Sequence, residues 1–403
     1  MNAIKCLFLI LILAKHLIAQ PNYFRVDGKN IIDPNGNTFI MKGVNLGNWL
    51  VPEGYMFKFK KANSPRNVNN VVTELIGPSE ARHFWIDFQD NYIMYKDIKF
   101  IKSIGINSIR VPFNYKLFCD ETYLWNTNSR GFELIDQLLE WCRIENLPII
   151  LDMHCAPGGQ TGDNIDDSYG YPWLFINEES QEQIIEIWKN IATHYSNESL
   201  IIGYDLMNEP IAHYFEEENL GMKLEPLYKK IVTAIREVDQ NHIIILGGAR
   251  WNTDFKIFSK PFDDKLVYEF HKYWMPPEQK EIQEYLDFRD KYDVPIYMGE
   301  SGENDDEWVL KFRQLLDEHS ISWHFWPYKK MDNSRGLINF DNPKYYDLII
   351  DYAESDRTTY KNIRENRPDV KKVKLALNGF LEQCKFENCF PNKGYLKALG
   401  LKF

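Results

Sequence analysis

Two glutamates stand at the ends of short apolar runs, directly before residues that break regular structure. Glu209 ends the run 202–209 and precedes a proline, and Glu300 ends the run 295–300 ahead of a Ser-Gly pair. An acidic side chain at the end of a buried strand needs a solvated pocket or a polar partner. Two such carboxyl groups at one rim could act as the nucleophile and the acid/base of a retaining glycoside hydrolase. Glu209 and Glu300 are therefore the candidate catalytic pair.

The elements that would position this pair are eight short apolar runs, which alternate with helical patterns. The runs cover residues 39–49, 108–113, 148–154, 201–208, 242–247, 266–271, 295–299 and 322–326. Between them, apolar residues repeat at helical spacing, most clearly in 181–195 and 307–319. Eight strand–helix units predict the α/β class and a closed (β/α)8 TIM barrel. An open doubly wound sheet is the alternative, but residues 43–48 lack the spacing of its phosphate-binding glycines.

Both ends of the chain add to the predicted barrel. The segment Asp33-Pro34-Asn35-Gly36 is expected to form the turn of an N-terminal hairpin that closes the bottom of the barrel. Residues 353–403 are charged and helical but still carry apolar side chains, which predicts a packed C-terminal helical extension. These side chains are Leu375, Leu377, Phe380, Leu381 and Leu399. We predict a signal peptide over 1–19 and a single barrel domain over 20–403.

Residues 1–19 have the features of a secretory signal peptide. Lys5 supplies a basic start, residues 6–14 form an apolar core, and Ala19 is a small residue at a plausible cleavage site. The core is too short to span a bilayer. We therefore predict a secreted, extracellular protein without membrane contact after cleavage. Two polar residues after the core interrupt the usual pattern, so a retained anchor is the alternative.

Composition limits the classes of partner. The net charge is −11 and no long basic run is present, so neither nucleic acid nor an anionic membrane is an expected partner. The 11 Trp and 23 Tyr suit a site that stacks on sugar rings, although an aromatic-rich core would also use them. We predict a polysaccharide or oligosaccharide substrate as the partner and make no prediction of the oligomeric state.

Five cysteines remain after the predicted signal peptide, so at least one thiol has no partner within the chain. Cys384 and Cys389 are close in sequence and are the pair expected to form a disulfide. No Cys/His spacing suggests a zinc site. Asn197 begins the one glycosylation sequon, Asn-Glu-Ser.

Several other polar or aromatic residues follow the predicted strands. In a TIM barrel the catalytic residues lie at the carboxyl ends of the strands, and packing does not explain so many polar residues there. The set is Asn45, Trp49, Arg110, His154, Asn208, Glu209, His271, Tyr273, Glu300 and Trp326. Together these residues predict one solvated active site.

A double displacement assigns roles within this set. Glu300 is the expected nucleophile, and a positive charge on Arg110 and a hydrogen bond from Tyr273 would keep it ionised. Glu209 is the expected acid/base, because the leaving oxygen needs a proton donor. Asn208 is expected to bind the sugar 2-hydroxyl, a contact that can strengthen in the transition state.

The segment Asn208-Glu209-Pro210, taken together with Glu300, resembles the signature of glycoside hydrolase family 5, the cellulase family. The likeness covers most of residues 39–330. Five further residues match active-site positions of that family, namely Arg110, His154, His271, Tyr273 and Trp326. The resemblance implies a TIM barrel, a retaining mechanism and substrate-binding roles for these five residues, with Trp326 stacking under the sugar at the cleavage point.

The first strand is similar to that of a subgroup of this family. Residues 43–53 resemble the first strand of exo-β-1,3-glucanases, which implies that Glu53 binds hydroxyls of the non-reducing sugar. A surface loop acid is the alternative reading of Glu53. Two departures leave the linkage open. Cys155 replaces the first glycine of the His-Gly-Ala-Pro-Gly loop that is frequent in these enzymes, and Pro-Tyr-Lys-Lys-Met over 327–331 replaces Lys-Thr-Glu after the eighth strand.

We predict a retaining hydrolase that cleaves β-glucosidic bonds in β-glucan, similar to exo-β-1,3-glucanases, with no cofactor and no metal. An endo-β-1,4-glucanase or β-mannanase is the alternative within the family. A catalytically silent carbohydrate-binding barrel is the alternative of another class, although binding alone needs neither glutamate. A metal-dependent hydrolase would need a ligand cluster. Asp163, Asp166 and Asp167 lack EF-hand spacing, which indicates a solvated acidic loop.

Overall fold

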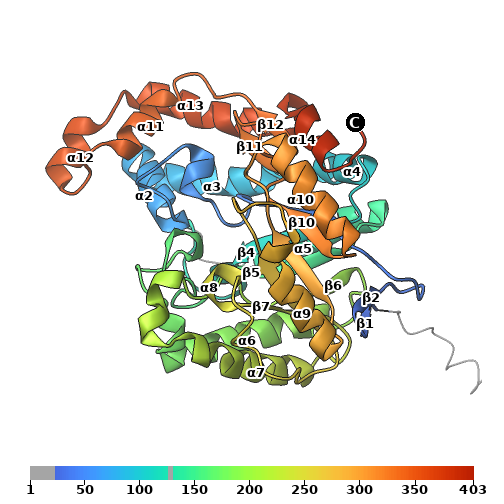
Figure 1. Ribbon diagram of the computed structural model, residues 1–403. Coiled ribbons are helices and arrows are strands. Elements are labelled where there is room, and N and C mark those ends of the chain that lie inside the picture. The colour runs from blue at the N-terminus through green and yellow to red at the C-terminus, as the bar shows by residue number, and fades with distance from the viewer. Residues whose placement is uncertain (1–22, 126–129) are drawn as a thin grey trace, which may run out of the picture.

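The computed structural model describes residues 23–125 and 130–403, so the predicted signal peptide lies outside the described residues. Eight parallel strands close into a barrel in the order β10-β3-β4-β5-β6-β7-β8-β9 (Figure 1). They are β3 Lys42–Asn45, β4 Ser108–Asn114, β5 Ile149–Cys155, β6 Ile201–Asp205, β7 Ile243–Gly247, β8 Leu266–His271, β9 Ile296–Glu300 and β10 Ser322–Phe325. Each strand falls within a predicted run or passes its end by one residue. The predicted (β/α)8 TIM barrel is confirmed.

Helices surround the barrel on the outside (Figure 1). Those between the strands are α2 Pro65–Ile76, α3 Pro78–Asn91, α4 Tyr95–Ser103, α5 Gly131–Glu145, α6 Glu178–Tyr195, α7 Gly221–Arg236, α8 Ala249–Asn252, α9 Gln283–Tyr292 and α10 Asp306–Glu318. The strands are almost entirely buried, because helices cover the outer face and side chains fill the interior. A pocket opens at the carboxyl ends of the strands, where barrel residues such as Glu300 can meet solvent.

Local chemistry explains where a helix such as α6 begins. The Asn177 side chain accepts a hydrogen bond from the Ser180 N–H at 2.9 Å and caps the helix. Ile184, Trp188 and Ile191 then repeat at helical spacing and are buried. The apolar stripe predicted a start at 181, which is three residues late, because the first turn is polar and carries no apolar signal.

A small hairpin packs on the amino-terminal end of the barrel, as predicted. Its strands are β1 Arg25–Asp27 and β2 Asn30–Ile32, and they are antiparallel. Phe24 and Ile31 are buried in one cluster with residues from the starts of the barrel strands, including Ile150 and Ile202. The predicted turn position was wrong. The hairpin turns at Gly28, which has a φ of +55°, and the predicted segment 33–36 makes a second reversal that brings Thr38 back to pair with Ile32.

The C-terminal segment lies across one side of the barrel, beside α2 and α3 (Figure 1). It contains α11 Asp347–Glu354, α12 Tyr360–Asn366, α13 Val370–Gln383 and α14 Lys393–Ala398. A three-stranded sheet joins it to the barrel, with β11 Lys329–Met331, β12 Ile338–Phe340 and β13 Phe390–Pro391. Phe380 of α13 stacks on Phe57 with ring centroids 5.1 Å apart.

Most of the apolar side chains predicted to pack in this segment do so. Leu377, Phe380 and Leu399 are buried and Leu381 is half-buried. The prediction was wrong for Leu375, whose side chain is 60% exposed. The buried positions of α13 repeat at helical spacing, and Leu375 falls on the opposite face.

The predicted disulfide is absent, since Cys384 and Cys389 are both free thiols, as are the other cysteines of the described residues. Each thiol contacts a different carbonyl: the Cys384 Sγ lies 3.4 Å from the Leu381 oxygen, and the Cys389 Sγ lies 3.3 Å from the Lys385 oxygen. No helix among residues 23–125 and 130–403 has the length and hydropathy to cross a membrane. Asn197 is exposed just after α6, and its glycosylation stays a prediction.

Candidate active site

A cavity of about 590 Å³ opens at the carboxyl ends of the barrel strands, a size typical of small-ligand sites. Seven of the nine predicted site residues line it. They are Glu53, His154, Glu209, His271, Tyr273, Glu300 and Trp326. Arg110 and Asn208 are fully buried and do not belong to this lining. The structure therefore brings the predicted residues together at one site, with Arg110 and Asn208 placed beneath its surface.

Glu209 and Glu300 meet at His271. The His271 Nδ1 lies 2.8 Å from a Glu209 oxygen and 3.9 Å from a Glu300 oxygen. The candidate ligand atoms of these three residues all lie within 4.8 Å of one another. The two carboxyl groups are therefore near neighbours across the cavity, although Glu209 follows β6 and Glu300 ends β9.

The loop after β5 fixes the backbone that carries Glu209. Glu209 has a left-handed φ of +44°, which a residue with a side chain adopts at some cost. The Thr161 hydroxyl donates a hydrogen bond to the Glu209 carbonyl at 2.7 Å, and the Gln160 amide donates one to the Asn208 carbonyl at 2.8 Å. These bonds offset the backbone strain and explain how an irregular segment can position a reactive side chain.

Arg110 connects the nucleophile candidate to the floor of the site. Its guanidinium is fully buried and donates to Glu300 at 2.6 Å, to Asp205 at 2.8 Å and to the Asn208 side-chain oxygen at 2.9 Å. It also lies 3.1 Å from a carboxylate oxygen of Asp152. A planar guanidinium with five N–H groups can make this many contacts without moving.

The charges around Glu300 favour its ionised form. Burial alone would raise the pKa of Glu300, but the nearby positive charges of His271, Arg110 and His154 outweigh burial and lower that pKa. The predicted hydrogen bond from the Tyr273 hydroxyl is present at 3.3 Å. The electrostatics of the site thus suit a carboxylate nucleophile.

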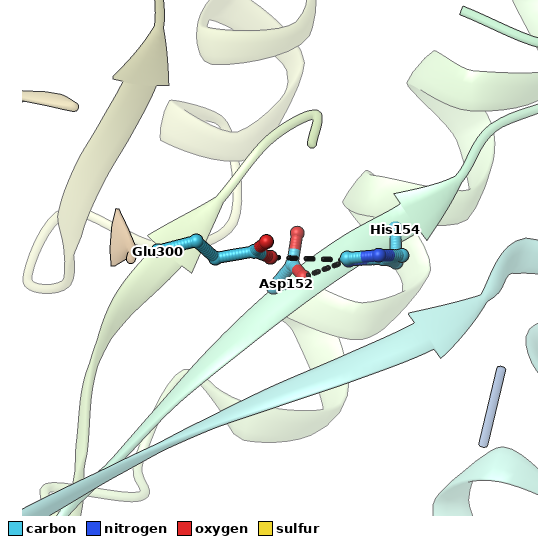
Figure 2. Close-up of side chains that lie close together, drawn as sticks. All are labelled: Asp152, His154 and Glu300. Atoms are coloured by element: carbon cyan, nitrogen blue, oxygen red, sulfur yellow. Dashed lines mark hydrogen bonds and ion pairs between the residues drawn. The ribbon is translucent and has the colours of Figure 1, made fainter. Parts of the chain in front are cut away.

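His154 and Trp326 form the neighbouring wall. Figure 2 shows Glu300 pointing toward His154, with Asp152 between the two. The His154 Nδ1 lies 2.8 Å from Asp152 and 3.8 Å from Glu300. Burial would lower the pKa of His154, but the charge of Asp152 and its hydrogen bond dominate and raise it to about 8. The Trp326 indole stacks parallel to the His154 ring, with centroids 5.5 Å apart, so it presents a flat apolar surface beside the reactive carboxylate.

Neighbouring carboxylates also raise the pKa of His271 and so favour its protonated form. Burial opposes charge on this ring, but Glu300, Glu209 and Glu269 together raise the pKa of His271 to about 10. Its Nε2 lies 3.1 Å from Glu269. Each ring nitrogen therefore faces a carboxylate, which fixes the ring orientation, and the cation sits between the two catalytic candidates.

Glu53 is not a surface acid. Its side chain is 4% exposed and lines the cavity, and its Oε1 is buried without a hydrogen-bond partner. Burial raises the pKa of Glu53 to about 8; the charge of His154 opposes that rise, and nearby glutamates add to it. A buried carboxyl with a free oxygen needs a polar partner.

Three acids of the site were missed by sequence reasoning, namely Asp152, Asp205 and Glu269. Asp152 and Glu269 stand two residues before His154 and His271 on β5 and β8, and alternate strand residues share a face. An acidic residue two positions before a predicted site histidine could therefore have been recognised as a second site residue. Burial raises the pKa of Asp205 well above its usual range, and repulsion from Glu269 adds to the effect, while the charge of Arg110 opposes it.

Tyr55 and Glu303 also line the cavity and were not predicted. Tyr55 lies in a short 3-10 helix, Gly54–Phe57, after β3, and Glu303 lies in an irregular loop after β9. Neither position belongs to a strand whose alternation would tell which way a side chain points. Trp49, in contrast, was grouped with the site by sequence, but its indole is buried and donates to the Gln89 carbonyl at 2.8 Å. Trp49 belongs to the packing around the barrel.

The short element α8, which follows β7 and whose backbone is not regularly helical, brings an aromatic side chain to the cavity. Arg250, Trp251 and Asn252 have left-handed φ values of +56°, +57° and +56°, which costs roughly 1–2 kcal/mol per residue. The Asn252 amide nitrogen lies 3.3 Å from Glu269 and 3.2 Å from His271. This anchored segment places Trp251 on the cavity lining, on the side where His271 holds Glu209.

Two groups of side chains in the described part of the chain have spacing that could hold a metal ion. One is Asp152, His154 and Glu300, and the other is Glu209, His271 and Glu300. In both groups the histidine already faces carboxylates, and Arg110 contacts Asp152 and Glu300 directly. This donor set fits proton transfer and nucleophilic attack, with Arg110 as a fixed positive charge.

The acidic loop after β5 differs from the prediction of a solvated loop. Asp163 and Asp167 are partly exposed, but Asp166 is buried and accepts hydrogen bonds from the backbone N–H groups of Thr161, Gly162 and Ser168. Asp166 therefore organises the loop that holds Glu209. Periodicity could not indicate this, because the bonds close an irregular turn.

The TIM barrel and its facing carboxyl groups define a glycoside hydrolase. Comparison with known families agrees, since the family model described as "Cellulase (glycosyl hydrolase family 5)" matches residues 64–332. The chain belongs to glycosyl hydrolase family 5. The predicted family resemblance and the prediction of an O-glycosyl hydrolase are confirmed, and membership implies a polysaccharide substrate.

Curated relatives carry several activities. A "Beta-xylosidase" of Phanerodontia chrysosporium is 26% identical over 369 residues, covering 82% of this chain and 75% of the relative. "Endoglucanase C" of Acetivibrio thermocellus is 27% identical over 316 residues, covering 63% and 89%. A "Probable glucan 1,3-beta-glucosidase A" of Aspergillus fumigatus is 26% identical over 282 residues, covering 68% and 64%. These relatives share the family and differ in substrate.

Solved structures resemble the barrel as a whole. The rutinosidase from Aspergillus niger superposes with a TM-score of 0.57 at 20% identity, covering 73% of this chain and 90% of that one. At this identity the likeness describes the fold alone.

Proposed function

We propose that the protein is a retaining β-glycosidase that removes sugars from the non-reducing end of a β-glucan by a two-glutamate double displacement. The observation that carries the proposal is the close approach of Glu209, His271 and Glu300, whose candidate ligand atoms lie within 4.8 Å of one another. Retaining enzymes hold their carboxyl groups about 5–5.5 Å apart, and inverting enzymes need about 6.5–9.5 Å to admit water.

In the first step Glu300 attacks the anomeric carbon. The C1–O bond to the leaving group breaks as the Glu300–C1 bond forms, and Glu209 transfers its proton to the departing oxygen. Arg110 and Tyr273 hold the two Glu300 oxygens, which orients the attacking lone pair. His271 engages Oε1 of Glu209, which leaves Oε2 to carry the proton. The cationic ring then faces the Glu209 carboxylate that this step creates.

In the second step a water molecule attacks the same carbon. Glu209 takes a proton from the water, the new C1–O bond forms, and the Glu300–C1 bond breaks. Both residues return to their starting forms, so the cycle balances without an oxidant, reductant or cofactor. Asn208 is proposed to bind the 2-hydroxyl through its amide, and Trp326 to stack under the ring at the cleavage point.

Exo action is supported by Glu53, because a carboxyl group on the cavity lining, with one oxygen that has no hydrogen-bond partner, suits free terminal hydroxyls. The likeness to a glucan 1,3-beta-glucosidase supports the same mode. The likeness to an endoglucanase favours internal cleavage as the second candidate. On laminarin, an exo enzyme releases glucose early with little loss of viscosity, whereas an endo enzyme lowers viscosity first and gives a ladder of products.

Stereochemistry tests the mechanism. Proton NMR of an early time course should show the β-anomer as the first product of a β-glycoside. Glu300→Ala should lose several orders of magnitude in turnover, and azide should restore part of it as an α-glycosyl azide. An α-anomer as first product, or near-normal activity of Glu300→Ala, would refute the double displacement.

Secretion after removal of residues 1–19 remains part of the proposal, as does a single catalytic domain over 20–403 with 353–403 as its packed extension. The basic start and apolar core of the N-terminal segment support secretion. Burial of Phe380 against Phe57 supports one folding unit, because both side chains share the core that covers the barrel.

A further inference from the structure

The segment that departs from the exo-β-1,3-glucanase pattern after the eighth strand supports one wall of the cavity. Lys330 lies in β11, and its Nζ is 2.7 Å and 2.6 Å from the two carboxylate oxygens of Glu303. Glu303 lines the cavity, whereas Lys330 is not part of the lining and has only 5% of its side chain exposed. We propose that Glu303, held by Lys330, is a specificity-determining residue that closes the glycone end of the cavity and accepts hydrogen bonds from hydroxyls of a terminal sugar.

This inference rests on the proposed function and deepens it. The position of the wall follows from the strand order. β10 and β3 are neighbours in the closed barrel, and β6 and β7 lie across from them. Tyr55 and Lys330 follow β3 and β10, while Glu209 and Trp251 follow β6 and β7. Because Glu209 protonates the leaving oxygen, the leaving group occupies the β6–β7 side, and the sugar that forms the glycosyl-enzyme occupies the side of Glu303.

The wall is continuous on that side. The Lys330 ammonium lies 4.6 Å from the centre of the Tyr55 ring, and the Trp326 indole N–H donates to the Tyr55 hydroxyl at 2.6 Å. Glu303 therefore lies on the same side of the cavity as Tyr55 and Trp326, the residue predicted to stack under the sugar. Burial first, and then the negative charges of Glu303 and Glu53, raise the pKa of Tyr55 well above its usual range, so this hydroxyl keeps its proton.

Glu303 retains the capacity to bind a ligand. A carboxylate offers about four lone-pair positions, and Lys330 uses one on each oxygen. The remaining positions can accept from two neighbouring hydroxyls. A neutral sugar with adjacent free hydroxyls fits this acceptor, whereas a sugar that bears a carboxylate would be repelled by Glu303 and Glu300 on the same lining.

The carboxylate is also fixed in place. Glu303 has a left-handed φ of +52°, and its carbonyl accepts from Arg335 at 3.1 Å and from the Trp274 indole at 3.4 Å. Lys329, which precedes Lys330 in β11, is fully buried and forms an ion pair with Asp97 at 2.8 Å. This ion pair anchors β11. A rigid acceptor costs little entropy when a sugar binds.

The test compares kcat and KM on 4-nitrophenyl β-glycosides of one and two sugars. In Glu303→Ala the KM for the monosaccharide substrate should rise about 10- to 100-fold, as for a lost hydrogen bond to a charged acceptor, while kcat changes much less. The ratio of kcat/KM for the disaccharide over the monosaccharide should rise at least about tenfold, because the end of the cavity opens. Glu307→Ala, which removes an exposed carboxylate that pairs with Lys311, is the control.

A charge swap separates binding from structure. The double variant Glu303→Lys/Lys330→Glu restores an ion pair but removes the acceptor from the lining, so its KM should stay high. Recovery of the wild-type KM by the swap would overturn the inference, and so would an unchanged KM or substrate ratio in Glu303→Ala. If Glu303→Ala fails to fold, Glu303→Gly, which also removes the side chain and suits the left-handed φ of this position, takes its place with the same expectations. If the wild-type enzyme cleaves internal bonds, both the proposed exo action and the proposed role of Glu303 are wrong. If the wild type acts from the chain end but the Glu303 variants keep its KM and substrate ratio, only the role of Glu303 is wrong.

Discussion

Replacing Glu53 by glutamine should make the stability of the protein less dependent on pH. Burial raises the pKa of Glu53 from an ordinary 4.5 to about 8. In the folded state the carboxyl therefore keeps a proton that the unfolded chain releases between these values. Folding stability falls as pH rises through this window, because the folded state binds more protons there than the unfolded state.

The size of the effect follows from the shift. Each pH unit corresponds to about 1.36 kcal/mol, so a rise of about 3.5 units gives an upper bound of about 5 kcal/mol. Water entry and repacking relieve part of this penalty. Glutamine has nearly the same shape and no ionisation, so Glu53→Gln should gain up to that amount relative to wild type between pH 5 and pH 8.

Denaturant unfolding at several pH values checks this expectation. The free energy of unfolding of Glu53→Gln minus that of wild type should increase from pH 5 to pH 8 and level off above it. Glu133→Gln, at an exposed position of α5, is the matched control and should show a difference that does not vary with pH. Parallel pH profiles for wild type and Glu53→Gln would refute the reasoning, because they would mean that Glu53 ionises normally in the folded state.

Three further predictions concern the proton donor, the C-terminal segment and the N-terminus. Glu209→Ala should lose more activity on natural glucans than on activated aryl glycosides, since only poor leaving groups need the proton; equal losses, measured by steady-state kinetics, would limit Glu209 to positioning. Phe380→Ala should destabilise the fold by about 3–5 kcal/mol, because the ring stacks on Phe57; unchanged denaturant unfolding would argue against a shared core. Sequencing of secreted protein should begin near Gln20 or Pro21, and an intact N-terminus in a membrane fraction would indicate an anchor instead.

The barrel could be predicted because its strands are short, apolar and regularly spaced. Residues such as Ile149 and Ile201 belong to continuous apolar runs, which are typical of the strands of a parallel sheet covered on both faces. The N-terminal turn was misplaced because two segments, at Gly28 and at 33–36, both carry turn chemistry. Leu375 was misjudged because its own hydrophobicity, and not its position on the face of α13, was taken as the signal.

Site residues at the ends of strands could be predicted from the sequence, whereas site residues in irregular loops could not. Glu209, His271 and Glu300 stand at strand ends or just beyond them, so the barrel brings them to one rim, and the loop after β5 then fixes the backbone of Glu209. Glu303 lies in an irregular loop, and its side-chain direction depends on Lys330, which follows a different strand. Such contacts arise from tertiary packing and leave no local pattern.

The disulfide expectation failed for a related reason. Proximity in sequence suggested that Cys384 and Cys389 could pair, but one residue caps α13 and the other follows a separate short turn. Bond formation needs a specific geometry of both side chains. Sequence distance gives no information about that geometry.

The central claim is that Glu300 forms a covalent bond to the sugar. Incubation with 2-deoxy-2-fluoro-β-D-glucosyl fluoride, followed by proteolysis and mass spectrometry of the peptides, tests it directly. We expect one adduct per chain, located on Glu300, with loss of activity in proportion to labelling and recovery on transfer to an acceptor sugar. An adduct on another residue, or steady turnover to the α-anomer without any adduct, would contradict the account.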